Sequence, residues 1–178
     1  PHPTWTPRVL EVLAGYDVHA TFFILGVNAT NFPGVVQSVV AAGHQPENHT
    51  YDHASLDQLD HDAFVAEVTS ADQAIVNAAG EGVLPIGCLR PPYGATDSRT
   101  ASFAGELGKT ITLWNLDTQD WRKPGAEQIT SHVLENVRPG SIVLMHDGGG
   151  DRDQTVAALD QVLRELSGRS YRFEFVCR

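Results

Sequence analysis

The sequence predicts an α/β fold in which a mostly parallel sheet is wrapped by helices. Helix-like and strand-like segments alternate along all 178 residues, which is the pattern of repeated strand–helix units. Most of the polar motifs fall at the end of a predicted strand or in the loop after it, where α/β folds carry their functional residues. The alternation falls short of eight units, which favours a smaller or distorted barrel over a complete one.

Each predicted helix is marked by apolar residues at helical spacing or by a capping residue. Thr6 is expected to cap the first helix, with Pro7 in its first turn. Asp97 is the expected cap of a later helix that runs to about Leu107. The predicted helices are Thr6–Leu13, Asn31–Ala42, Leu56–Ala79, 97–107, Ala126–Val137 and Gln154–Leu166.

Short apolar or aromatic runs between these helices predict the strands. No linker, internal repeat or low-complexity tract interrupts the alternation, so we expect a single domain over residues 1–178. The predicted strands are His19–Leu25, Leu84–Leu89, Thr110–Leu116, Ser141–Met145 and Tyr171–Val176.

Composition narrows the class of protein. Hydrophobic residues make up 42% and charged residues 19%, which is typical of a globular chain with a sizeable core. No apolar run approaches the roughly 20 residues of a membrane span. The net charge is −10 and no stripe of Lys and Arg is present, which argues against nucleic acid or an anionic membrane surface as a partner. Because the chain begins at Pro1 rather than Met, we expect that an upstream part was removed or left out.

The two cysteines leave two alternatives open. Cys177 closes one predicted strand and Cys88 lies near the end of another, so the two side chains could pair. Two buried free thiols fit the sequence about as well.

Four short motifs follow one another in a fixed order. They are H-T-Y-D-H at 49–53, R-P-P-Y-G at 90–94, D-T-Q-D-W at 117–121 and L-M-H at 144–146. His49 and His53 would share one face, and could share a metal, if their segment turned helically. Spacing alone is a weak signal for a metal site, and the absence of Glu after His49 excludes an H-E-x-x-H protease motif.

Together with Gly43-His44 upstream of Asn48, these motifs resemble the signature of the polysaccharide deacetylase family. This family is carbohydrate esterase family four and is also called the NodB-homology domain. The resemblance runs from Pro1 to about Val176 and implies a distorted (β/α) barrel. It also implies that a first strand ending in two aspartates is missing, because the opening P-H-P-T-W-T would come just after it.

The resemblance further implies that His49 and His53 bind a divalent metal, most often zinc, with cobalt or another divalent ion as alternatives. The carboxylate that completes such a site would come from the missing segment. The family usually has small or aliphatic residues where this chain has Pro46 and Glu47. Glu47 is expected to be a surface charge, and the alternative is a substitute carboxylate for the metal.

Two of the remaining motifs imply catalytic roles by the same resemblance. Arg90 would orient the catalytic aspartate, and the backbone N–H of Tyr93 would bind the oxyanion of a tetrahedral intermediate and contact the substrate. Asp120 would pair with His146, which would protonate the leaving group.

Substrate contacts are implied as well. Trp121 would form a wall of the substrate groove, because an aromatic ring suits the apolar face of a sugar. Leu144 and His146 lie on the same side of the predicted strand, which suits a leucine that lines a small acyl pocket.

The implied reaction is metal-dependent removal of acetyl groups from a carbohydrate polymer, as N-deacetylation of a chitin- or peptidoglycan-type glycan. The alternatives are an acetylxylan O-esterase and a catalytically impaired glycan-binding remnant. The expected partner is an acetylated polysaccharide or oligosaccharide, the expected state a monomer, and the expected location extracellular or in the cell envelope. Because two histidines make a weaker site than three protein ligands, we expect these 178 residues alone to bind metal poorly and turn over little.

Overall fold

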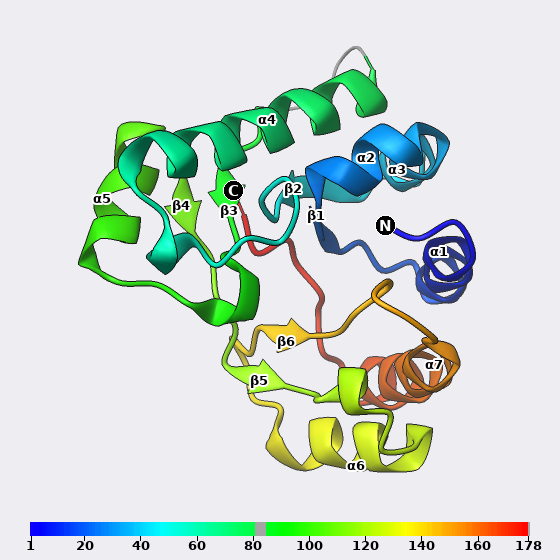
Figure 1. Ribbon diagram of the computed structural model, residues 1–178. Coiled ribbons are helices and arrows are strands. Elements are labelled where there is room, and N and C mark those ends of the chain that lie inside the picture. Colours follow the sequence, from blue (N-terminus) through cyan, green and yellow to red (C-terminus); the bar gives the residue numbers. More distant parts are fainter. Residues whose placement is uncertain (81–84, 178) are drawn as a thin grey trace. The chain divides into compact units, whose positions relative to one another are not determined.

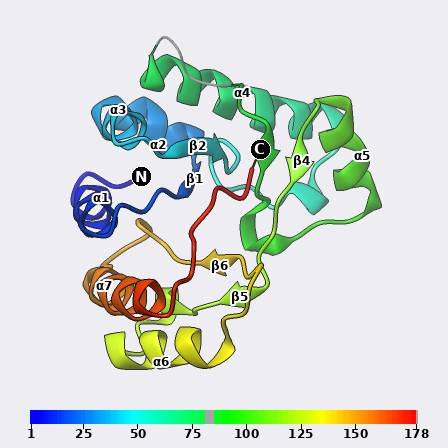
Figure 2. The same ribbon diagram turned by 180° about the vertical axis from the view of Figure 1, so that it is seen from behind.

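The computed structural model describes residues 1–80 and 85–177, which form two compact units (Figures 1 and 2). The first unit holds Thr21–Leu113 together with Pro1 and the C-terminal segment from Phe175. The second holds His2–Ala20 and Trp114–Glu174. Each unit has its own parallel sheet, as the α/β prediction requires.

The sheet of the first unit has the strand order β1-β2-β3-β4, and every neighbouring pair is parallel. β1 and β2 pair along their whole length, from Thr21 opposite Gln45 to Ile24 opposite Asn48. β3 joins β2 where Leu89 lies opposite Asn48. The strands are β1 (Thr21–Ile24), β2 (Gln45–Asn48), β3 (Cys88–Leu89) and β4 (Thr110–Ile111).

Helices cover this sheet. They are α2 (Gly26–Asn31), α3 (Pro33–Ala41), α4 (His61–Ala79) and α5 (Ser98–Glu106), with 3₁₀ turns η1 (Leu56–Gln58) and η2 (Pro92–Gly94). The long helix α4 packs against α2, α3, α5 and β2 (Figure 1). Its buried Ile75 packs in one cluster with Ile24, and its buried Phe64 and Val68 pack in another with Leu89. Burial of each such side chain contributes about 1.5–3 kcal/mol, so these contacts fix the helix on the sheet.

The second unit is built around a two-stranded parallel sheet, β5 (Leu116–Asp117) and β6 (Val143–Leu144). Its helices are α1 (Trp5–Gly15), α6 (Ala126–Asn136) and α7 (Asp153–Gly168), and a 3₁₀ turn, η3, spans Asp120–Arg122. α7 packs against both α1 and α6. The buried core consists of Leu116, Val133, Val137, Val162 and Leu166.

The helix predictions are largely confirmed, and the differences lie at the ends. Asp97 caps α5 by accepting a hydrogen bond from Thr100 N, as expected. α4 begins after Asp60, which accepts from Ala63 N, rather than at Leu56. The five-residue offset arises because the 3₁₀ turn η1 precedes the helix and a capping aspartate separates the two.

The predicted helix Asn31–Ala42 is divided at its start. Phe32, with φ −132° and ψ 55°, separates α2 from α3, because the residue before Pro33 is disfavoured in the helical region. α2 was not predicted as a helix of its own.

Thr6 is not the cap of α1, because the helix begins at Trp5. The Thr6 hydroxyl accepts a hydrogen bond from His2 N at 2.7 Å and donates to Asp147 Oδ2 at 2.6 Å. Pro7 does lie in the first turn, as predicted.

The predicted strand Thr110–Leu116 is wrong as a single element, because it separates into β4 and β5 in two different sheets. The carbonyls of Thr112 and Leu113 between them accept hydrogen bonds from the Arg90 side chain instead of from a neighbouring strand. The Arg90 side chain therefore replaces a neighbouring strand as hydrogen-bond partner, and β4 ends at Ile111.

Two further strand predictions change. Tyr171–Val176 forms no strand; the Val176 amide donates to the Thr21 hydroxyl at 3.2 Å, and the Tyr171 amide bonds back to the end of α7. The predicted strand Leu84–Leu89 is shorter, and Leu84 lies outside the described residues.

β2 was missed because its sequence, Q-P-E-N, has low strand propensity. Pro46 and Glu47 are nevertheless buried between β1 and β3. The Glu47 carboxylate accepts a hydrogen bond from Cys88 N at 2.7 Å, so a side chain joins the strands where backbone pairing is sparse.

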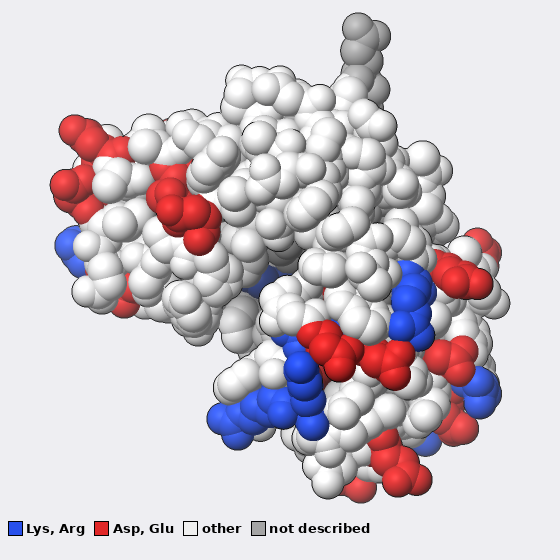
Figure 3. All heavy atoms as spheres, turned by 45° about the vertical axis from the view of Figure 1, so that its right-hand side comes forward, with Lys and Arg blue, Asp and Glu red and all other residues white. Residues whose placement is uncertain are grey.

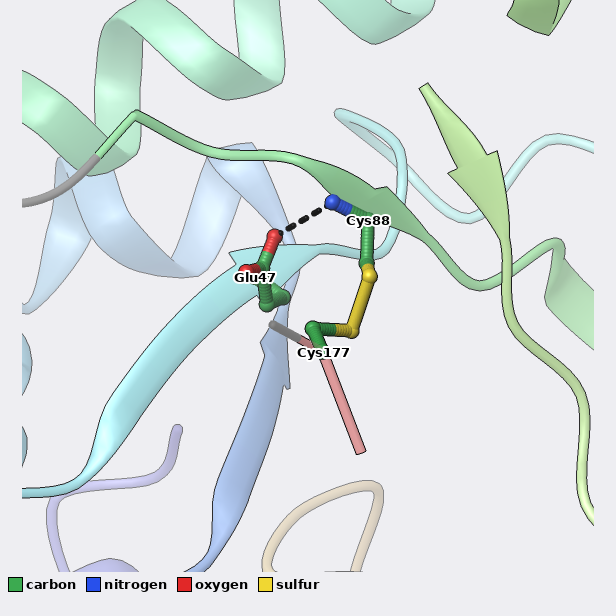
Figure 4. Close-up of side chains that lie close together, drawn as sticks. All are labelled: Glu47, Cys88 and Cys177. Carbon is green, nitrogen blue, oxygen red and sulfur yellow. Dashed lines mark hydrogen bonds between the residues drawn. A yellow bond between two sulfur atoms is a disulfide. The ribbon is translucent and has the colours of Figure 1, made fainter. Parts of the chain in front are cut away.

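The cysteines form a disulfide between Cys88 on β3 and Cys177, with 6.2 Å between their Cα atoms (Figure 4). The paired alternative is therefore the one observed. The bond joins residues 89 positions apart, so it fixes the C-terminal segment to the sheet of the first unit.

Charged side chains of both signs lie on the surface. On the face in Figure 3, Lys and Arg side chains lie among Asp and Glu and form no continuous basic stripe. In the described part of the chain, no helix has both the length and the apolar character needed to cross a membrane.

Candidate functional site

The predicted site residues form two groups, each following the ends of parallel strands in its own unit. The first unit contributes His49, His53, Arg90 and Tyr93. The second contributes Asp120, Trp121, Leu144 and His146.

The loop after β2 carries the two predicted metal ligands on an irregular backbone, and the helical turn considered from their spacing does not form. Thr50 and His53 have φ of 68° and 75°, in the left-handed region that non-glycine residues rarely occupy. The two imidazole rings are brought together all the same. The centroids of His49 and His53 are 5.0 Å apart in an edge-to-face arrangement.

The buried Asn48 side chain holds this loop through hydrogen bonds. Its side-chain oxygen accepts from Thr50 N at 2.7 Å, and its amide donates to Val68 O at 2.9 Å and to Asp72 Oδ1 at 2.7 Å. The Thr50 hydroxyl in turn accepts from His53 N at 3.1 Å. The unusual backbone is therefore held by a buried amide, which offsets the strain of positive φ.

The ring of His49 has a defined orientation. Its Nδ1 lies 2.6 Å from the backbone oxygen of Arg90, and a carbonyl can only accept, so Nδ1 carries the proton. The acceptor nitrogen of the neutral ring is then Nε2. A backbone carbonyl that fixes the tautomer in this way is typical of histidines that bind metals.

The Arg90 side chain is buried against the sheet. Its Nε donates to Thr112 O at 3.1 Å and its Nη2 to Leu113 O at 3.2 Å. The guanidinium carbon lies 3.9 Å from the ring centroid of Phe23, a cation–π contact. Burial lowers the pKa of Arg90 to about 10, so the group remains a cation at neutral pH. Its predicted role as partner of a catalytic aspartate stays a prediction.

Tyr93 occupies a strained position in the 3₁₀ turn η2, with φ 62° and ψ 2°. The next two amides, Gly94 N and Ala95 N, donate to the carbonyls of Pro91 and Pro92, and the Tyr93 N–H is outside this pair of bonds. Its side chain is 72% exposed, and its ring meets the edge of His53 at 4.7 Å between centroids. The Tyr93 ring therefore contacts the histidine loop, and the predicted oxyanion role of the Tyr93 amide stays a prediction.

In the second unit, Asp120 and His146 form the predicted pair. His146 Nδ1 lies 2.6 Å from Asp120 Oδ1, and His146 N donates to Asp120 Oδ2 at 2.8 Å. Thr155 on α7 also donates to Oδ2, at 2.8 Å. Both carboxylate oxygens therefore have partners, although Asp120 is only 1% exposed.

These contacts determine whether the Asp120 carboxyl group is ionised. Burial alone raises the pKa of Asp120, but the hydrogen bonds and charge of His146, with the Thr155 hydroxyl, outweigh it. The pKa of Asp120 is held below the ordinary aspartate value of 3.8, so the group is an anion at neutral pH.

The predicted substrate contacts differ in exposure. Trp121 is 47% exposed, and the guanidinium carbon of Arg122 lies 4.7 Å from its ring centroid. Such an exposed indole suits an aromatic platform for a sugar. Leu144 is buried, and its carbonyl accepts from the Thr118 hydroxyl at 2.7 Å.

Glu47 is not a surface charge, because its side chain is almost fully buried. Burial raises the pKa of its carboxyl above the ordinary value of 4.5, against the lowering effect of amide hydrogen bonds from Cys88 and Gly87. Within the described residues, Glu47 groups with the two cysteines rather than with His49 and His53. The substitute-carboxylate alternative is therefore not supported by this placement.

Sequence reasoning missed the residues that support the site. Asn48 was named only as part of the histidine motif and was given no role. Its place in that motif was the signal that could have identified it. Thr155 had no signal at all, because it lies 35 residues from Asp120 in an ordinary helix.

Comparison with known proteins identifies the family. The family model described as polysaccharide deacetylase matches residues 1–112. A peptidoglycan-N-acetylglucosamine deacetylase from Bacillus cereus is 38% identical over 175 residues, which cover 97% of this chain and 80% of the relative. A chitooligosaccharide deacetylase from Sinorhizobium fredii is 36% identical over 181 residues, which cover 96% of this chain and 83% of the relative.

A solved structure is also similar along nearly the whole chain. It is a crystal structure of a peptidoglycan N-acetylglucosamine deacetylase bound to an N-hydroxybenzamide compound, with TM-score 0.93 and 34% identity. The match covers 99% of this chain and 81% of that one, and it confirms the predicted fold class. The chain belongs to the polysaccharide deacetylase family.

Proposed function

We propose that this protein hydrolyses acetyl groups from the amino sugars of a chitin- or peptidoglycan-type glycan. The observation that carries the proposal is the Asp120–His146 pair, a buried carboxylate bonded to both the ring and the backbone of one histidine. A carboxylate that holds one ring nitrogen fixes the direction of the other, which suits a group that transfers a proton. The name of the Bacillus cereus relative, a peptidoglycan-N-acetylglucosamine deacetylase, supports the choice of an amide over an ester.

His146 is assigned the proton that leaves with the product. Asp120 holds Nδ1, so Nε2 is the nitrogen that gives its proton to the departing amine. Thr155 and the His146 amide fix the carboxylate, which prevents the ring from rotating away. A group positioned in this way contributes about 10²–10⁴-fold to a rate.

His49 and His53 are assigned to a divalent metal such as zinc. The donor set fits: both rings follow the same strand end, and the Arg90 carbonyl fixes the His49 tautomer that leaves Nε2 as acceptor. When bound, such an ion polarises a carbonyl and lowers the pKa of a water molecule. The chain's own part is to present two neutral imidazoles on a loop braced by Asn48.

The remaining residues position the substrate. The Tyr93 amide is assigned to the developing oxyanion, because preorganised backbone donors act most strongly where charge appears. Trp121 is assigned to a sugar ring and Leu144 to the acetyl group. Arg90 holds the carbonyl that orients His49 and acts as a positioning residue.

We also propose that the protein acts as a monomer outside the cytoplasmic membrane, in the cell envelope or beyond it. The Cys88–Cys177 disulfide supports this location, because disulfides persist in oxidising compartments. Polymeric cell-wall glycans would be found in the same place.

One observation favours a second candidate, a glycan-binding protein with impaired catalysis. A structure described as a family-four carbohydrate esterase pseudoenzyme from Bacillus anthracis matches 97% of this chain with TM-score 0.88 and 27% identity. A member of the same fold can therefore lack the activity.

Acetate release from N-acetylated chitooligosaccharides tests the proposal, with acetylated xylan oligosaccharides as the O-acetyl comparison. Release should require added zinc or cobalt and stop with a chelator. His146→Gln should reduce it about 10²–10⁴-fold. The exposed His132→Gln serves as matched control and should keep full activity.

The outcomes separate the candidates. Release from xylan alone would replace N-deacetylation by O-deacetylation. Saturable binding of the oligosaccharides without any release would support the impaired binder. Equal activity of the His146 variant and the His132 variant would remove the assigned proton donor.

A further inference from the structure

A second set of metal-binding atoms lies in the first unit, apart from the histidines. One oxygen of Glu47 and the sulfurs of Cys88 and Cys177 all lie within 4.8 Å of one another. All three side chains are buried, and Figure 4 shows the carboxylate of β2 beside the disulfide that joins β3 to the C-terminal segment.

We propose that reduction of the Cys88–Cys177 disulfide creates a metal site from Glu47, Cys88 and Cys177, selective for a thiophilic divalent cation such as zinc or cadmium. This inference does not depend on the proposed function, because it uses none of the residues assigned to deacetylation.

The reduction step balances with a dithiol as reductant. The dithiol gives two electrons and two protons, the S–S bond breaks to give two thiols, and the dithiol closes to its own disulfide. Binding of the cation then displaces one proton from each thiol into solvent, because the thiolate is the ligand.

The spacing suits a tetrahedral centre. Zinc–sulfur bonds of about 2.3 Å and zinc–oxygen bonds of about 2.0–2.2 Å place neighbouring ligand atoms about 3.6–3.8 Å apart. The three donor atoms already lie within 4.8 Å, so only a small separation of the two sulfurs is needed. The Cα atoms of the cysteines, 6.2 Å apart, leave room for it.

The surroundings also favour a cation. A buried carboxylate and two buried thiolates would be costly without a compensating charge. The Glu47 side chain is already held toward β3 by its hydrogen bond from Cys88 N at 2.7 Å. The Thr112 hydroxyl, 3.7 Å from Cys177 Sγ, is close enough to hydrogen-bond the sulfur. Soft thiolate donors select zinc or cadmium over magnesium or calcium.

Cobalt titration tests the site, because thiolate ligands give charge-transfer absorption that histidine and carboxylate ligands do not. The full chain is reduced with a dithiol, desalted under anaerobic conditions and titrated with cobalt chloride. Reduced protein should develop the thiolate-to-cobalt band and saturate near one sulfur-ligated cobalt per chain. Unreduced protein should not develop it.

Variants assign the ligands. Glu47→Gln should bind cobalt at this site at least tenfold more weakly, whereas Glu11→Gln, an exposed control, should bind as wild type does. The double variant C88S/C177S should lose the thiolate band. Absence of the band in folded, reduced wild type would overturn the proposal, as would equal affinity of the Glu47 and Glu11 variants.

Circular dichroism measures whether the reduced chain stays folded. If the reduced chain unfolds, cobalt should restore the fold of wild type and not that of the double cysteine variant. Failure of cobalt to restore it would equally overturn the proposal.

Discussion

The two groups of site residues are held in opposite ways. In the second unit, a buried anion and a histidine satisfy each other, and Thr155 completes the carboxylate. In the first unit, the histidine loop is held through its backbone by the Asn48 side chain and by the Glu67 carboxylate, which accepts from Tyr51 N at 2.9 Å, and the Arg90 carbonyl orients the His49 ring. The Asp120 carboxylate thus bonds the His146 ring directly, whereas the Glu67 carboxylate bonds the loop backbone. Because His49 and His53 are the proposed metal ligands and His146 is not, changes in the histidine loop should alter the response to metal and changes in the aspartate–histidine pair should not.

The largest effect should come from comparing Asp120→Asn with His53→Ala over a range of zinc concentrations. Asp120→Asn should lose about 10²–10⁴-fold in kcat at every zinc concentration, because its defect lies in proton transfer. His53→Ala should lose most at limiting zinc and recover partly in excess, because its defect lies in metal affinity. Steady-state acetate release measures both, and recovery of the Asp120 variant by zinc would contradict the distinction.

The bracing of the histidine loop can be tested by stability. Asn48→Ala removes the acceptor of the buried Thr50 amide and the donor to Val68 O, although Asp72 keeps its ion pair with Lys109, and the free energy of unfolding should fall by about 1–3 kcal/mol. Urea denaturation measures it. Asn77→Ala, an exposed change on α4, should stay within about 0.5 kcal/mol of wild type. A similar loss in both variants would mean that the loop does not depend on Asn48.

A smaller effect is expected at the proposed sugar platform. Trp121→Ala should raise KM for chitooligosaccharides roughly two- to tenfold, corresponding to about 0.5–1.5 kcal/mol of lost aromatic contact, with kcat little changed. Trp5→Ala is the matched control, because the Trp5 indole also lies beside an arginine. The guanidinium carbon of Arg8 is 5.1 Å from its ring centroid. A change in kcat rather than KM would assign Trp121 to the chemistry.

The smallest effect should appear only in acid. The folded-state pKa of Asp120 is below 3.8, so the stabilisation from its ionised form is complete above that value and is lost as pH falls through the folded pKa. The stability difference between wild type and Asp120→Asn should therefore shrink below pH 3.8 in urea titrations at stepped pH. A difference that stays constant with pH would mean that ionisation of Asp120 does not stabilise the fold.

Local motifs could be placed from the sequence more easily than the strands could. Arg90, Asp120 and His146 follow predicted strands, whereas His49 could not be assigned to a strand end because β2 was missed. The Asp120–His146 pair was predicted and is present, whereas the catalytic and binding roles of all these residues stay predictions.

The errors have long-range causes. β2 is a strand because it pairs with β1 and β3, and Glu47 also bonds to Cys88, 41 residues away; no local pattern in Q-P-E-N indicates these contacts. The segment after β4 leaves the sheet because the carbonyls of Thr112 and Leu113 accept hydrogen bonds from the Arg90 side chain. The disulfide remained one of two alternatives because pairing depends on distance in space.

The disulfide also changes what a protease can do to this chain. A single cut anywhere between Cys88 and Cys177 would leave two fragments that remain covalently joined. Such a nicked molecule would migrate as one species on a non-reducing gel and separate only after reduction. Half of the chain, including the proposed proton donor His146, could thus survive backbone cleavage without being released.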